Sequence, residues 1–118
     1  MKRAVGFLAM STMLGCASLT FPDRVPSITG EIIEMGEDTI FANGDAGAIW
    51  VKESPTDPCG IVFRTHEAEI GDRLDDGSVR ERGVADLAVG QQVRVWAGAI
   101  ADSCPAQGIA EAIEIVSG

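Results

Sequence analysis

The chain has 118 residues, with 9 basic and 18 acidic side chains for a formal charge of −9, and 46% of its residues are hydrophobic. This length is enough for one small domain, and the apolar content is too high for a generally disordered chain. Binding to a nucleic acid backbone depends on Lys and Arg, so the acidic balance excludes nucleic acid as an expected partner and disfavours electrostatic attraction to an anionic lipid surface.

The N-terminus has the order of an export signal. Lys2 and Arg3 precede an uncharged, mostly apolar run over residues 4–14, and Gly15 directly precedes Cys16. The apolar run is shorter than the roughly 20 residues that a transmembrane helix needs. A signal peptide over residues 1–15 is therefore predicted, and an ordinary signal peptide cut nearby, which would release a secreted or periplasmic soluble protein, is the alternative.

Met13-Leu14-Gly15-Cys16 resembles the lipobox of bacterial lipoproteins, in which cleavage directly precedes the Cys. The resemblance implies that Cys16 becomes the N-terminus and carries fatty acyl chains such as palmitate, which anchor the protein to a membrane of the cell envelope on its extracytoplasmic side. Two or three such chains, at about 0.8 kcal/mol per buried CH₂, make a stable anchor without a spanning helix. Loss of Lys2 and Arg3 would leave 7 basic against 18 acidic residues, or −11.

If Cys16 is acylated, Cys59 and Cys104 remain as an even pair in a compartment that permits disulfides. A bridge between them is predicted to close a loop of about 45 residues and to contribute about 3–4 kcal/mol through chain entropy. A reactive thiol at either position is the competing interpretation, although the sequence has no Cys-x-x-Cys motif.

Residues 16–27 contain Pro22 and Pro26 and show no regular period, which predicts a tether. The domain is expected over residues 28–116, where runs of β-branched residues are separated by Gly, Asn, Asp and Pro. Within it, Asn43-Gly44-Asp45 favours a hairpin turn. Strands are predicted at residues 28–35, 38–42, 48–53 and 60–65, with the second and third forming that hairpin.

Residues 66–82 admit two interpretations. Phe63, Ile70 and Leu74 have the spacing of a helical stripe, whereas Asp75-Asp76-Gly77 is typical of a turn between two polar strands, and the hairpin is favoured. Residues 84–90 then fit one helical turn that stops at Gly90. The last strands are predicted at residues 92–100 and 109–116, on either side of a break at residues 103–105.

Glu111 interrupts an apolar pattern in the last predicted strand. With strict alternation it shares a side with Ile109, Ile113 and Ile115. A buried carboxylate without a partner is unfavourable, so Glu111 is expected at a barrel rim, where it reaches water.

The sequence around the last two strands resembles a known type of domain. Asp86-Leu87-x-x-Gly90-Gln91-x-Val93, then Ser103-Cys104-Pro105-x-Gln107, then an Ala- and Ile-rich strand is similar to the small exported OB-like domains of unknown function found in bacterial lipoproteins. The resemblance implies an all-β, five- to six-stranded, partly open barrel with one short helical turn over residues 28–116. It implies no particular ligand.

Metal and cofactor motifs are incomplete. His66-Glu67-Ala68-Glu69-Ile70 begins like a zinc-protease signature but has Ile70 in place of the second His. Residues 72–77 resemble the start of a calcium loop, yet Leu74 and Gly83 stand at two ligand positions, and a turn at Asp76-Gly77 explains the pattern. No metal or cofactor is therefore expected. A small extracytoplasmic enzyme or metal-dependent module using His66 and nearby carboxylates is the alternative function.

Trp50 and Trp96 are the candidate ligand-binding residues, because indole rings can stack on sugars or peptides. Packing in the core or at a rim is the other interpretation of both. The sequence thus predicts a non-enzymatic, membrane-anchored module that binds an envelope protein or a small ligand. A purely structural envelope protein is a third possibility.

Overall fold

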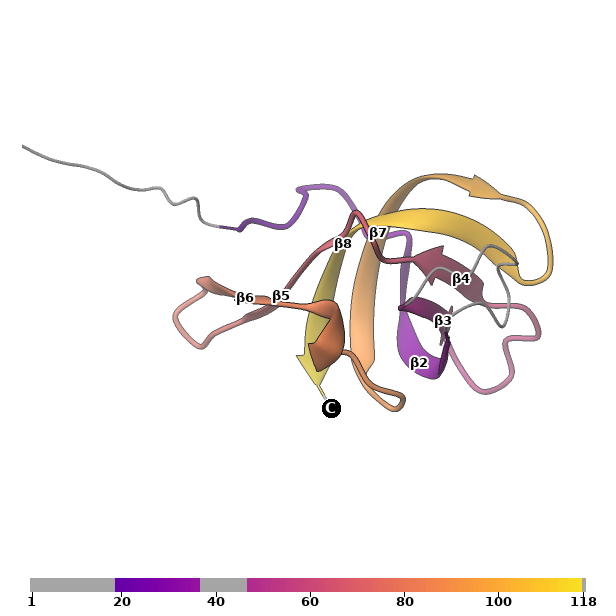
Figure 1. Ribbon diagram of the computed structural model, residues 1–118, viewed down its shortest axis with the longest axis horizontal. Helices are drawn as coiled ribbons and strands as arrows, with labels where there is room; N and C mark the ends of the chain where they lie inside the picture. Colours follow the sequence, from indigo (N-terminus) through magenta and orange to yellow (C-terminus); the bar gives the residue numbers. More distant parts are fainter. Residues whose placement is uncertain (1–18, 37–46, 118) are drawn as a thin grey trace, which may run out of the picture.

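The computed structural model describes residues 19–36 and 47–117, which form a mainly β domain (Figure 1). Within this part of the chain, no helix is long and apolar enough to cross a membrane. The elements are β2 (Ile28–Gly36), β3 (Ala48–Lys52), β4 (Ile61–Arg64), β5 (Glu69–Arg73), β6 (Val79–Arg82), the 3-10 turn η2 (Val84–Asp86), β7 (Gln92–Ala101) and β8 (Ala106–Ser117).

The strands follow the order β4-β3-β2-β7-β8-β5-β6, and β4 also pairs with β8. Five strands therefore close into a ring, whose last pairing, β4 with β8, is parallel, while its other pairings are antiparallel. Along its edge away from β7, β8 pairs with two strands: its first part pairs with β4 and its second part with β5. The predicted all-β, partly open barrel is confirmed, and the β5–β6 hairpin raises the described strands from the expected five or six to seven.

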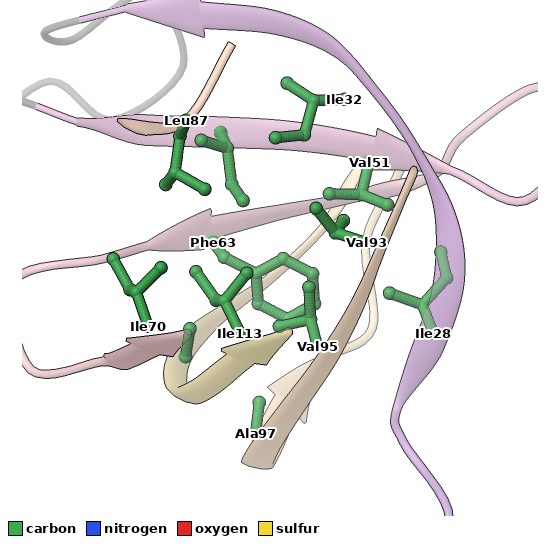
Figure 2. Close-up of a cluster of buried hydrophobic side chains, with 12 residues drawn as sticks. Ile28, Ile32, Val51, Phe63, Ile70, Leu87, Val93, Val95, Ala97 and Ile113 are labelled. Carbon is green, nitrogen blue, oxygen red and sulfur yellow. The ribbon is translucent and has the colours of Figure 1, made fainter. Parts of the chain in front are cut away.

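The core lies inside the ring and is built from alternate residues of the strands (Figure 2). Phe63 of β4 is its largest fully buried side chain. The other members of this cluster come from both sides of the ring, and they include Ile28, Ile32, Ile49, Val51, Ile70, Leu87, Val93, Val95, Ala97, Ala110 and Ile113.

The loop after η2 explains the motif Asp86-Leu87-x-x-Gly90-Gln91 in structural terms. Leu87 is buried in the core, and Gly90 adopts a φ of +99°, which a glycine takes without strain. The side chain of Gln91 holds the loop together, since its Nε2 donates to Asp86 O and its Oε1 accepts from Ala88 N–H. The predicted helical turn is present, although only Val84–Asp86 are helical.

Residues 66–82 form the favoured hairpin, β5–β6, and not a helix. At its tip, the Asp76 carboxylate accepts hydrogen bonds from the Ser78 N–H at 2.9 Å and the Ser78 hydroxyl at 2.6 Å, and both bonds lower the pKa of Asp76. The predicted strand at residues 38–42 and its turn lie outside the described residues. The described neighbours of β3 are β2 and β4.

Two expectations need correction. Residues 19–27, assigned to a tether, pack on the outer face of the barrel, where Phe21 is 9% exposed. Glu111 reaches water, as predicted, but it does so at a bulge of β8 and not at the rim of an apolar face: Trp96 pairs with Ala112, whereas Ala97 pairs with Ala110. The extra residue reverses the alternation, so Ile113 faces the core while Glu111 is exposed on the outside.

Candidate functional site

A disulfide joins Cys59, in the loop between β3 and β4, to Cys104, in the turn between β7 and β8. Their Cα atoms are 4.8 Å apart, and the two residues are separated by 45 positions in the sequence. The predicted pairing is confirmed. The bridge ties together two connections that border neighbouring strands of the ring.

The loop between β3 and β4 is organised around Asp57. One carboxylate oxygen of Asp57 accepts the N–H groups of Cys59 and Gly60, both at 3.1 Å, and the other accepts Glu53 N–H at 3.4 Å. Trp50 lies over the same loop and donates its indole N–H to Cys59 O at 2.8 Å. Gly60 has a φ of +64°, and a Cβ there would lie 2.8 Å from the indole nitrogen. The loop that carries Cys59 is therefore held in one conformation.

The hydrogen bonds from Cys59 and Gly60 lower the pKa of Asp57 below its ordinary value of 3.8. This contribution to stability is present above the ordinary pKa and is lost as pH falls through the lowered one. Asp57→Ala is therefore expected to lower Tm at neutral pH, with the difference from the wild type shrinking as the pH falls from about 4 toward 2. Thermal unfolding across this range measures it. Asp57→Asn, which keeps the shape of the side chain but has no ionisable carboxylate, is the control. A Tm difference between the wild type and Asp57→Ala that stays constant with pH would contradict the assignment.

A groove follows the outer side of β8 near its start and the facing end of β7. It consists of a cavity of about 520 Å³ and an adjoining one of about 250 Å³, which share Gln107, Gly108 and Ile109. Arg64 borders the smaller cavity. We call this surface the β8 groove, and its full lining is Arg64, Glu67, Gly98, Ala99, Ile100, Ala101, Gln107, Gly108, Ile109 and Glu111.

The β8 groove exists because small residues gather where β7 and β8 pair irregularly. The register shifts between Ala97 and Ile100, and Gly108 lies opposite Ile100. A Cβ on Gly108 would come within 3.3 Å of Ile100 Cγ1, so the Ile100 side chain packs closely against this glycine. Ile109 is 40% exposed in this groove. The surface can accept an apolar group, with an arginine on one side and carboxylates on the other.

The two tryptophans do not form the expected stacking surface. Trp96 is only 3% exposed, because the Phe21 ring stacks on it with ring centroids 5.4 Å apart. Its indole N–H also donates to Arg24 O at 2.7 Å. Trp50 is partly exposed, but Lys52 Nζ lies 5.1 Å from its ring centroid. For Trp96 the packing interpretation is correct, since its ring has no free face.

His66 and the nearby acids are dispersed. His66 Nε2 lies 3.5 Å from Glu67 Oε2, and the His66 side chain is 46% exposed. Asp72 accepts two hydrogen bonds from Arg80, at 2.7 and 3.2 Å, which lowers the pKa of Asp72. Over residues 19–36 and 47–117, no three His, Cys, Asp or Glu side chains are grouped so that they could hold a metal ion.

Glu114 is a buried carboxylate that sequence reasoning missed. Its side chain is 4% exposed, with Arg73 Nε at 3.1 Å from one oxygen and Arg94 Nη1 at 3.1 Å from the other. Arg94 lies directly opposite Glu114 in the β7–β8 pairing, and Gly71 of β5 lies opposite on the other side. The available sequence signal was the presence of Arg73 and Arg94 in two of the predicted strands. Only the pairing of β8 with β5 and β7 shows that both arginines meet at Glu114.

These features define a small, disulfide-bridged, partly open β-barrel domain with a groove along one strand. Residues 28–117 match the model of DUF3221, described as a protein of unknown function, and the chain belongs to this family. No match to the chain was found among the curated proteins or among the solved structures.

Proposed function

We propose that this protein is an extracytoplasmic lipoprotein, anchored to a bacterial membrane through Cys16, whose OB-like barrel binds another envelope protein or a small ligand in the β8 groove. Binding, and not catalysis, is the proposed role. The β8 groove is the observation that carries the proposal, because this shallow, open surface combines an exposed isoleucine with flanking charges.

The topology supports an OB-like assignment. The ring has five strands, and OB barrels bind their ligands on one sheet face and on the loops after the first and fourth strands. In chain order the ring strands are β2, β3, β4, β7 and β8, so the connection after the fourth strand is the turn between β7 and β8, which contains Cys104. The β8 groove begins beside this turn, at Ala101 and Gln107.

The disulfide supports an extracytoplasmic location, because such bridges persist in oxidising compartments. The lipobox-like Met13-Leu14-Gly15-Cys16 supports anchoring there. With a mature formal charge of −11, an OB-like barrel would repel nucleic acids, so the proposed partner is a protein or a small molecule.

Photo-crosslinking in cells tests the groove. A photoreactive residue at Ile109 is expected to crosslink the full chain to a discrete partner, while the same residue at Val116 is not. Both positions are on β8 and similarly exposed, at 40% and 45%, but only Ile109 lines the groove. For a small ligand, the expected result is co-purification that is lost in Ile109→Asp and retained in Val116→Asp.

Mass spectrometry of the membrane fraction from the same cells tests the anchor. The mature chain is expected to begin at Cys16 and to carry the mass of its acyl chains. Equal crosslinking at both positions, with no ligand lost from Ile109→Asp, would contradict binding in the groove. A soluble, unacylated chain would contradict the anchor independently of that result.

A further inference from the structure

Residues 19–27, which precede the residues that match the family, contact the barrel at several points, and we call this segment the strap. Phe21 is its main apolar contact. The Phe21 ring stacks on Trp96 with an angle of 12° between the planes, and the guanidinium carbon of Arg73 lies 5.1 Å from the centroid of the same ring. Arg73 is itself held by the buried Glu114, so the site that receives Phe21 is fixed by the sheet.

Polar contacts fix the rest of the strap. Trp96 donates to Arg24 O, and the Arg24 guanidinium pairs with Glu111 on the bulge of β8. Ser27 N–H donates to Val95 O at 2.8 Å, and Ser27 Oγ accepts from Ala97 N–H at 3.0 Å. The strap therefore has defined partners from Phe21 to its junction with β2.

The start of the strap lies on the β5–β6 hairpin. Leu19 occupies space that Gly71 of β5 leaves open, since a Cβ on Gly71 would lie 2.7 Å from Leu19 Cδ2. Leu19 and Thr20 also border both cavities beside the hairpin, of about 480 and 490 Å³. In Figure 1 this end of the strap is on the side of β5 and β6, away from β3 and β4.

We propose that the strap holds the barrel against the lipid bilayer in a fixed orientation, with the β5–β6 hairpin toward the lipid headgroups and the β3–β4 side facing away. This inference rests on the proposed acylation of Cys16. Leu19 is three residues from Cys16, and three residues span at most about 11 Å. Because Leu19 packs on the hairpin at Gly71, an acylated Cys16 would have to lie within about 11 Å of that contact.

The hairpin fits this position. Leu74 at its tip is 41% exposed and available to a lipid surface. Three of its charged side chains are paired within the protein, because Asp72 pairs with Arg80 and Arg73 pairs with Glu114. The Asp72–Arg80 pair carries no net charge, so it adds no repulsion between the hairpin and anionic headgroups.

Fluorescence quenching of the full, acylated chain in phosphatidylcholine vesicles tests the orientation, with a quencher on the lipid headgroups. A fluorescent residue is placed at Leu74, or at Thr56 in the exposed loop between β3 and β4 as the matched control. Quenching is expected to be severalfold stronger at Leu74. Equal quenching at the two positions would overturn the inference.

Two variants separate the strap from the anchor. Phe21→Ser removes the stacking contact and is expected to abolish the difference between the two positions. An insertion of about ten Gly and Ser residues after Ala17 leaves every strap contact intact but adds a flexible reach of roughly 17 Å, and is expected to do the same. If neither variant changes the quenching of an acylated chain, the strap does not set the orientation. A chain whose mass lacks acyl groups would refute the anchor itself.

Discussion

Replacing Cys59 and Cys104 together by serine is expected to lower the free energy of unfolding by about 3–4 kcal/mol, because the bridge closes a loop of 45 residues in the unfolded chain. A domain of this size is stable by only about 5–15 kcal/mol, so the effect is large. Urea unfolding of the oxidised wild type and of the double variant measures it.

The reduced wild type is the control for this double substitution. It is expected to unfold at the same urea concentration as the double variant, because both lack the bridge but differ in side-chain chemistry. A loss below about 1 kcal/mol would show that the loops around Cys59 and Cys104 stay associated in the unfolded chain, contrary to the entropic account.

Phe63→Ala is expected to lower the free energy of unfolding by about 3–5 kcal/mol, because Phe63 is completely buried in the main core cluster. The residue is on β4, which closes the ring by pairing with β8. Loss of its ring removes packing and leaves a cavity at the closure. Chemical denaturation, followed by the fluorescence of the two tryptophans, measures the change.

Phe63→Leu is the matched variant, because it keeps an apolar side chain of intermediate volume, and a clearly smaller loss is expected. The exposed Val116→Ala on β8 is expected to change stability by less than about 0.5 kcal/mol. If Phe63→Ala cost no more than Val116→Ala, the ring closure around β4 would not depend on this core.

Local chemistry made several features predictable. The hairpin could be predicted because the Asp-Gly turn at residues 76–77 depends only on neighbouring residues. The disulfide could be predicted because Cys59 and Cys104 remain as a pair once Cys16 is set aside. The alternation of Val93 and Val95 likewise predicted a core-facing strand. Such features need no knowledge of which strand lies beside which.

The features that were missed depend on pairing between distant residues. The strap was interpreted as a tether because its prolines and irregular pattern are typical of linkers, but Trp96 and Arg73, more than 50 positions away, give Phe21 a binding site. The position of Glu111 depended on a bulge, which is visible only from the register against β7. The β8 groove has no sequence signal, since it arises from small residues on two strands at a shift in register.

Length, composition and charge predicted a small acidic domain that does not bind nucleic acids, and periodicity and turn residues predicted the mainly β character that the structure has. Tertiary structure alone decided which face each residue occupies, where the barrel closes, and that residues 19–27 pack on the barrel. The reason is physical: strand propensity and turns are local, whereas register, bulges and burial are set by partners far away in the sequence.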